Sequence, residues 1–174
     1  MDQPPIRRPG EDEYPSTLQN YFGALEGDDL LEILRDQLRE IDALAAISDD
    51  KARFRYQDGK WSVKEVLGHL ADSERVFAYR AMRIGRGDDT PMPGFDEQTY
   101  AAASHADTRA AEHLAGELRA LRQATIALFE SLDPDALSRR GVANTRVISA
   151  RALGWTIAGH FAHHGRVLRE RYGV

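Results

Sequence analysis

Apolar residues recur at helical spacing in four stretches of this chain. In the first, residues 28–47, leucine and isoleucine return every three or four positions, as they do on the buried face of an amphipathic helix. The same spacing marks residues 62–85, 107–132 and 150–172. Four helices of roughly 20 residues, each with one apolar stripe, bury those stripes most economically as an all-α four-helix bundle.

Capping residues mark where these helices begin and end. Ser62 and Glu65 have the S-x-x-E spacing of a capping box at the start of the second helix. Asp107 and Ser149 are predicted to cap the third and fourth helices. The helix ends are predicted at Gly85 and Gly87, at Asp133–Pro134 and at Gly173.

The other segments carry little helical periodicity. Residues 1–27 contain four prolines and are predicted to be an extended lead-in packed on a bundle domain of residues 28–174. The loop at 88–100 contains prolines and a glycine, and its length suggests a cover over a functional site. Residues 135–148 are predicted to be a short turn and an irregular stretch, with little support for strands. The lead-in is expected to contact the bundle through Tyr14, Leu18, Tyr21 and Phe22.

Composition narrows the functional classes. A length of 174 residues predicts one domain, and the net charge of -5 argues against a nucleic-acid-binding surface. The absence of cysteine excludes disulfides and thiolate ligands, so any metal must be held by nitrogen and oxygen. The chain has no apolar secretory segment and no apolar run long enough to span a membrane, so a cytoplasmic protein without a membrane partner is predicted.

The most informative residues lie in the fourth apolar stretch, within GHFAHHGR. His160 and His164 are four positions apart, and therefore about 40° apart around a helix axis, which lets two imidazoles reach one ion. The same helix face carries leucine, isoleucine and phenylalanine, so both rings are expected to point into the bundle. His163 lies about 100° from His164 and is expected at the periphery.

His69, in the second apolar stretch, can supply a third nitrogen from a facing helix. Three protein ligands with positions left for water or substrate are typical of catalytic metal sites. We therefore predict one divalent metal ion held by His69, His160 and His164. The alternative is a metal-free bundle whose core histidines have hydrogen-bond partners, because an unpaired buried imidazole would cost roughly 1–3 kcal/mol.

Acidic residues near this site have two interpretations each. Asp72 follows His69 by one helical turn and could orient an imidazole or a water, although a surface aspartate on a helix needs no such role. Asp96 and Glu97 could reach the site if their loop folds over it, but acidic residues beside prolines often only solvate a turn. Trp61 and Trp155 are expected to be packing residues, and His105 and His113 to be solvated.

Two sequence elements together resemble a known family. They are DGKWSVKEVLGHLADSERVFAYRAMRIGRGDDTPMPGFDEQTYA, with its W-S-x-x-E-x-x-x-H pattern, and AGHFAHHGRVLRERY, with its H-x-x-x-H pattern. In this order and separation they are similar to the DinB-like superfamily, in particular to its YfiT-type branch of metal-dependent hydrolases. The similarity extends over about residues 30–172.

The resemblance implies more than the residue pattern does. It implies an up-down-down-up bundle, often dimeric, with one nickel or zinc ion on three histidines, which correspond here to His69, His160 and His164. Some members of the superfamily are S-transferases or isomerases that use thiols such as bacillithiol or mycothiol. The name of the family refers to a DNA-damage-inducible gene and does not imply DNA binding.

Two classes of function follow. The first is an enzyme, a hydrolase or a low-molecular-weight-thiol S-transferase, in which the metal activates water or a thiol toward a small-molecule substrate. The second is a non-catalytic, metal-stabilised binding or stress-response module. The module predicts a closed coordination sphere with a fourth protein ligand such as Asp72 or Asp96, and the enzyme predicts an open one. No motif in the sequence identifies the substrate.

Overall fold

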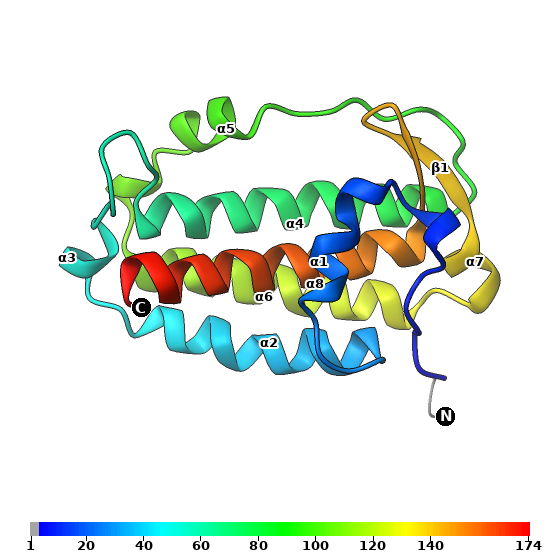
Figure 1. Ribbon diagram of the computed structural model, residues 1–174, viewed down its shortest axis with the longest axis horizontal. Coiled ribbons are helices and arrows are strands. Elements are labelled where there is room, and N and C mark those ends of the chain that lie inside the picture. The colour runs from blue at the N-terminus through cyan, green and yellow to red at the C-terminus, as the bar shows by residue number, and fades with distance from the viewer. Residues whose placement is uncertain (1–3) are drawn as a thin grey trace.

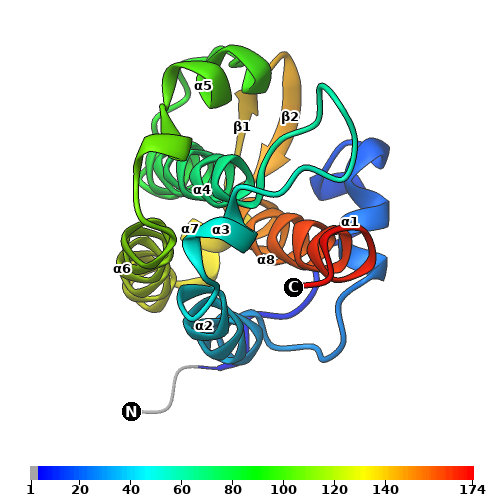
Figure 2. The same ribbon diagram turned by 90° about the vertical axis from the view of Figure 1, so that its left-hand side faces the viewer.

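Four long helices form the bundle in the computed structural model, which describes residues 4–174. They are α2 (Leu30–Ala45), α4 (Val63–Gly85), α6 (Ala111–Glu130) and α8 (Ala150–Val167). Helices α2 and α8 run in one direction and α4 and α6 in the other, so the predicted up-down-down-up topology is confirmed (Figure 1). Viewed along the bundle, α4 lies beside α6 and α8, and α2 closes the other side (Figure 2).

The predicted residues define several helix ends. Ser62 Oγ accepts a hydrogen bond from the amide of Glu65, and the Glu65 carboxylate accepts one from the amide of Ser62, which completes the capping box. Ser149 Oγ accepts from the amide three residues on and caps α8. Gly173 follows the π-helical turn Leu168–Tyr172 with a φ of 66°, a left-handed conformation that glycine adopts without strain.

The prediction that Asp107 caps the third helix is wrong. Helix α6 begins at Ala111, and the amide of this residue donates to the carboxylate of Asp49 at 2.9 Å. Asp107 instead accepts hydrogen bonds from Ser62 Oγ at 2.5 Å and from Arg55 at 2.7 Å. A carboxylate gains more from an arginine and a hydroxyl than from one backbone amide, so Asp107 supports the start of α4.

The segment before α8 contains a hairpin where an irregular stretch was expected. Strands β1 (Arg140–Ala143) and β2 (Arg146–Ser149) pair antiparallel around Asn144 and Thr145, whose φ angles are 49° and 62°. These positive values are typical of a type I′ turn. Threonine rarely adopts them and each strand has only four residues, so the sequence pattern gave no clear strand signal.

Short helical elements fill the other connections. They are the 3-10 turns Glu11–Glu13, Ser16–Leu18 and Ala106–Thr108 and the helices α1 (Gln19–Gly23), α3 (Asp49–Ala52), α5 (Glu97–Ala103) and α7 (Pro134–Ser138). Residues 4–27 are thus less extended than expected, and α1 lies against α8 (Figure 1). The expected contacts with the core are made by Tyr14, Leu18, Tyr21 and Phe22.

A polar network crosses the apolar core. Arg122 of α6, which is 0% exposed, donates to both carboxylate oxygens of Glu74 on α4 and to the amide oxygen of Gln37 on α2. The Gln37 amide in turn donates to the backbone carbonyl of Ala158 on α8 at 2.9 Å. One set of hydrogen bonds therefore joins all four long helices.

Within residues 4–174, none of the helices combines the length and apolar character needed to cross a membrane.

Candidate metal centre

Three histidines from two antiparallel helices meet inside the bundle. Nε2 of His160 lies 3.0 Å from Nε2 of His69 and 3.1 Å from Nε2 of His164. One ligand atom from each residue falls within 4.8 Å of the others. His69 and His160 are buried and His164 is partly buried. The structure therefore brings together the three histidines singled out by spacing and helix face.

The local sequence explains this convergence. The capping box sets the start of α4 and places His69 in its second turn, opposite the end of the antiparallel α8. His160 and His164 lie one turn apart on α8. Gly159 lets α1 approach this part of α8, because a Cβ atom at this position would lie 2.7 Å from the backbone oxygen of Tyr21.

The three nitrogens fit a shared cation better than hydrogen bonds to one another. Each ring nitrogen of a neutral imidazole offers either one N–H or one lone pair, so Nε2 of His160 cannot bond well to two neighbouring nitrogens. Nitrogens bound tetrahedrally to one zinc ion at about 2.0–2.1 Å would lie about 3.4 Å apart. The distances of 3.0 and 3.1 Å for two of the pairs are close to this spacing, and one ligand atom of each residue lies within 4.8 Å of the others, so the three can converge on one ion.

Burial keeps these imidazoles in the form that binds metals. It lowers the pKa of His69 to about 4 and that of His164 to about 3, and it holds the pKa of His160 well below its ordinary value. All three rings are thus neutral near pH 7, with lone pairs available. Aromatic rings surround them: the Trp61 ring lies 4.7 Å from that of His69, and the Phe77 ring lies 5.8 Å from that of His160.

Other candidate residues lie outside the cluster. Asp72 accepts a hydrogen bond from Arg75 on its own helix, and Asp96 accepts one from the amide of Thr99 and caps α5. His163 is only partly buried, and its ring lies 5.5 Å from that of Tyr21. Trp155 packs in the core, and His105 and His113 are exposed, as expected.

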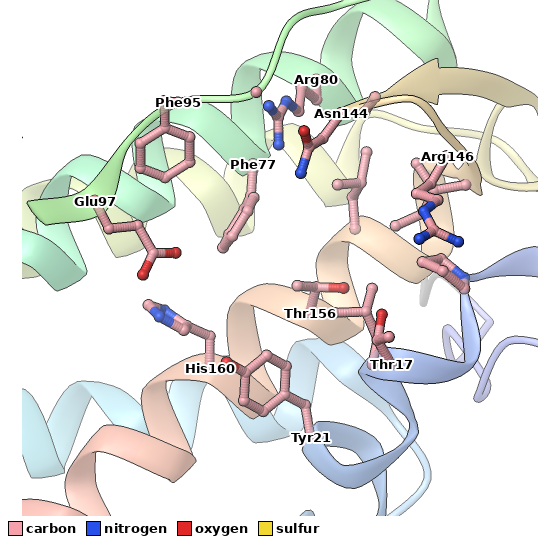
Figure 3. A pocket seen from close by; sticks show the side chains of 16 residues that line it. Thr17, Tyr21, Phe77, Arg80, Phe95, Glu97, Asn144, Arg146, Thr156 and His160 are labelled. Carbon is pink, nitrogen blue, oxygen red and sulfur yellow. The ribbon is translucent and has the colours of Figure 1, made fainter.

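Glu97 is the acidic residue of the covering loop that faces the site. Figure 3 shows its carboxylate directed toward His160. Burial raises the pKa of Glu97, and the neighbouring charge of Asp96 raises it further. The sequence pattern could not separate Glu97 from Asp96. In the structure α5 begins here. Asp96 caps this helix, and the side chain of the next residue, Glu97, points toward the bundle (Figure 3).

Two pockets open beside the histidines. One of about 340 Å³ extends from His160 and Glu97 to the β-hairpin, where Arg80, Asn144 and Arg146 line its other end (Figure 3). A second, of about 290 Å³, is lined by His164, His163, Trp61 and Gln98. Helix α5 contributes to both, so the loop predicted to cover a site does border the histidine cluster.

Comparison with known proteins identifies the family. A model of the DinB superfamily matches residues 30–168 of this chain. The chain belongs to the DinB superfamily. A relative from Bacillus licheniformis, named "putative metal-dependent hydrolase", is 32% identical over 137 residues, or 75% of this chain and 77% of the relative. A relative from Oceanobacillus iheyensis with the same description is 26% identical over 57 residues, and the match spans only 32% of its length.

Two solved structures of the same architecture support the fold. YfiT from Bacillus subtilis, described as having an unusual four-helix bundle topology, is 22% identical, with a TM-score of 0.66 over 95% of this chain and 93% of that chain. A mycothiol-dependent maleylpyruvate isomerase is 15% identical, with a TM-score of 0.67 over 83% of this chain and 61% of that chain. The expected family and the four-helix bundle are thereby confirmed.

Proposed function

We propose that this DinB-superfamily protein is a metal-dependent enzyme that holds one zinc or nickel ion through His69, His160 and His164. The observation that carries this proposal is the convergence of three neutral imidazole nitrogens next to a pocket. The Bacillus licheniformis relative, named "putative metal-dependent hydrolase", and YfiT, described as "a probable metal-dependent hydrolase", support it. Three protein ligands would leave coordination positions for a reactant.

The proposed reaction is hydrolysis of a small molecule or S-transfer to a low-molecular-weight thiol. When bound, the ion would lower the pKa of a coordinated water or thiol and so supply a nucleophile near neutral pH. Glu97 is placed to accept a proton at its carboxylate, because it points toward His160 and its pKa is raised toward the working range of a general base. Trp61 and Phe77 place aromatic rings beside His69 and His160.

The binding step is tested by metal analysis of protein purified without an affinity tag. We expect one ion per chain in the wild type and none in His160→Ala, whereas His105→Ala, which changes an exposed histidine, keeps the ion. Quenching of Trp61 fluorescence by added Ni²⁺ gives a second readout, because the indole lies 4.7 Å from the His69 ring. Stoichiometric metal in His160→Ala would contradict the ligand assignment.

The catalytic step is tested by a screen of hydrolytic and thiol-conjugation reactions, with His164→Ala as the inactive comparison. A metal-loaded wild type that turns over nothing and has no exchangeable water on its ion would favour the non-catalytic module. The fourth ligands expected for such a module, Asp72 and Asp96, have other partners in the described structure.

The proposal also covers the substrate, the other binding partners and the oligomeric state of the protein. The proposed substrate is a small molecule, such as a thiol, and neither nucleic acid nor a membrane is a proposed partner. A homodimer is proposed from the family resemblance. Light scattering coupled to gel filtration tests it, and a monomer mass at micromolar concentration would exclude a stable dimer.

A further inference from the structure

Arg80 is a buried charge at the end of the larger pocket. Its side chain is on α4, the residue is 6% exposed, and one guanidinium nitrogen donates to the backbone carbonyl of Pro93 at 2.6 Å. The guanidinium carbon lies 5.9 Å from the ring centre of Phe95. Within residues 4–174, Arg80 forms no ion pair with a carboxylate. The Arg80 side chain, which carries the remaining N–H groups, lines the pocket (Figure 3).

A buried guanidinium without a counter-charge is an unusual arrangement. Removing a charge from water is costly, and folded proteins normally offset this cost with an opposite charge or a full set of hydrogen bonds. One backbone carbonyl satisfies only one of the five N–H groups of an arginine. The unmet hydrogen-bonding capacity of Arg80 is therefore available to an anion that enters the pocket.

An amide lies beside Arg80, and a second cation lines the same pocket. Asn144 of the hairpin turn and Arg146 of β2 line the same pocket, and Figure 3 shows Asn144 beside Arg80 and Arg146 further along the pocket. Arg146 is exposed and forms no ion pair with any described residue. Helix α4 and the hairpin thus provide three side chains with N–H donors that line this pocket.

The backbone holds this end of the pocket in place. The amide of Met92 donates to the carbonyl of Val142 at 2.9 Å, and the amide of Asn144 donates to the carbonyl of Met92 at 3.0 Å. The Asn144 side chain rests on Gly94, where a Cβ atom would lie 2.4 Å from its amide oxygen. The hairpin and the loop after α4 are therefore joined, and the donors are positioned before any ligand arrives.

We propose that Arg80, assisted by Asn144 and Arg146, binds a carboxylate group of the substrate. This inference rests on the proposed function, because it assigns the substrate class of the same site. The apolar part of the substrate would lie against Phe77 and Leu153, which also line the pocket, and its reacting end would reach His160. A pocket of about 340 Å³ suits a small molecule.

The charge at the opposite end fixes the orientation. Glu97 lies beside His160, and its carboxylate would repel a substrate carboxylate placed there. The arginines attract the same group at the hairpin end. A substrate with a carboxylate at one end and its reacting bond at the other is therefore the one that matches the charge distribution of the pocket.

The test is a binding experiment that does not depend on turnover. Hexanoate, phenylacetate and 4-phenylbutyrate are each compared with their primary amides by ligand-observed NMR, using the purified full-length protein. We expect at least one carboxylate to bind more tightly than its amide. Arg80→Met should weaken carboxylate binding by about tenfold or more, the usual loss for a hydrogen bond to a charged group, and leave amide binding unchanged.

Matched variants separate this inference from the metal proposal. Arg83→Met removes the same charge one turn further along α4, where the guanidinium pairs with Asp88, and it should bind carboxylates as the wild type does. Arg80→Lys keeps the charge and should bind at an intermediate level. His164→Ala, whose altered residue does not line this pocket, should still bind carboxylates even if the metal proposal fails.

Three outcomes would overturn the inference. They are equal binding of acids and amides across the series, wild-type carboxylate affinity in Arg80→Met, and Arg80-dependent binding of inorganic phosphate in the absence of carboxylate binding. Circular dichroism of each variant shows whether it is folded. If Arg80→Met does not fold, the comparison of Arg80→Lys with Arg83→Met decides the question.

Discussion

Arg122 and Arg80 are both buried arginines of the bundle, yet their surroundings differ. Arg122 donates three hydrogen bonds, two to Glu74 and one to Gln37, and its guanidinium carbon lies 5.0 Å from the ring centre of Phe161. Arg80 donates one hydrogen bond, to a backbone carbonyl, and lines a pocket. Both are almost fully shielded from solvent, with exposures of 0% and 6%.

The difference shows how the same residue type can serve the fold or a ligand. The carboxylate of Glu74 and the amide of Gln37 surround Arg122, so its charge is neutralised when the helices pack. Arg80 has no carboxylate partner among residues 4–174, and we propose that an anion entering the pocket supplies one. The partners of a buried arginine, rather than its burial, thus separate a structural charge from a binding charge.

The largest expected effect comes from breaking the paired arginine. Glu74→Ala leaves Arg122 charged and uncompensated in the core, and we expect it to lower the free energy of unfolding by about 3–5 kcal/mol. Urea denaturation monitored by circular dichroism measures this change. Glu74→Met with Arg122→Met removes both charges and should cost less than Glu74→Ala alone. A double variant as unstable as the sum of its single changes would contradict this interpretation.

A smaller effect is expected from metal addition. Zinc at about 100 times its dissociation constant should stabilise the folded state by about 2.7 kcal/mol. The same increase is expected in Arg80→Met, because Arg80 is not a proposed ligand, and no such increase is expected in His164→Ala. Thermal unfolding with and without the metal gives the measurement. Loss of the increase in Arg80→Met would show that the two ends of the pocket are coupled.

Removing the unpaired arginine should change stability least among the core variants. Arg80→Met loses one hydrogen bond to Pro93 but also removes a buried charge, so the net change should be about 1 kcal/mol or less in either direction. Urea denaturation beside Glu74→Ala provides the comparison. A loss as large as that of Glu74→Ala would mean that Arg80 is structural, which would weaken the distinction between the two arginines.

Local spacing allowed much of the fold and part of the candidate site to be predicted. The i,i+4 spacing of His160 and His164 and the capping box at Ser62 are encoded by residues a few positions apart, which helix geometry fixes without knowledge of the rest of the chain. The family resemblance supplied the topology, which periodicity alone leaves open. His69 was predicted by the facing-helix argument, and the resemblance supported all three histidines.

Features that depend on distant residues could not be predicted in the same way. Asp107 stands before a helical pattern, but its partner Ser62 is 45 positions away. Arg80 and Arg146 belong to different elements, and nothing in either local sequence shows that they share a pocket. Arg122 looks like any polar position of an amphipathic helix until α2 and α4 place Gln37 and Glu74 beside it.

The smallest expected effect compares an unpaired with a paired carboxylate. Burial, and after it the charge of Asp96, raises the pKa of Glu97 in the folded state. The contribution of Glu97 to the free energy of unfolding is therefore fully present below its ordinary pKa of 4.5, and it is lost as the pH rises through the folded-state pKa. Glu97→Gln should therefore match the wild type at pH 4.5 and be slightly more stable at pH 7, by a small margin because the residue is largely exposed.

Glu117 provides the matched case with the opposite sign. Although burial acts to raise the pKa of Glu117, hydrogen bonds from Arg75 and Arg109 lower it overall. Its contribution to stability is present above 4.5 and is lost as the pH falls through the folded-state pKa. Glu117→Gln should therefore be less stable than the wild type at pH 7, with the difference shrinking in acid. Urea denaturation of both variants between pH 4 and 8 gives the measurement. If the two variants differed from the wild type with the same sign at pH 7, the comparison would be contradicted, because an acid that faces an open pocket and an acid held by two arginines would then respond alike.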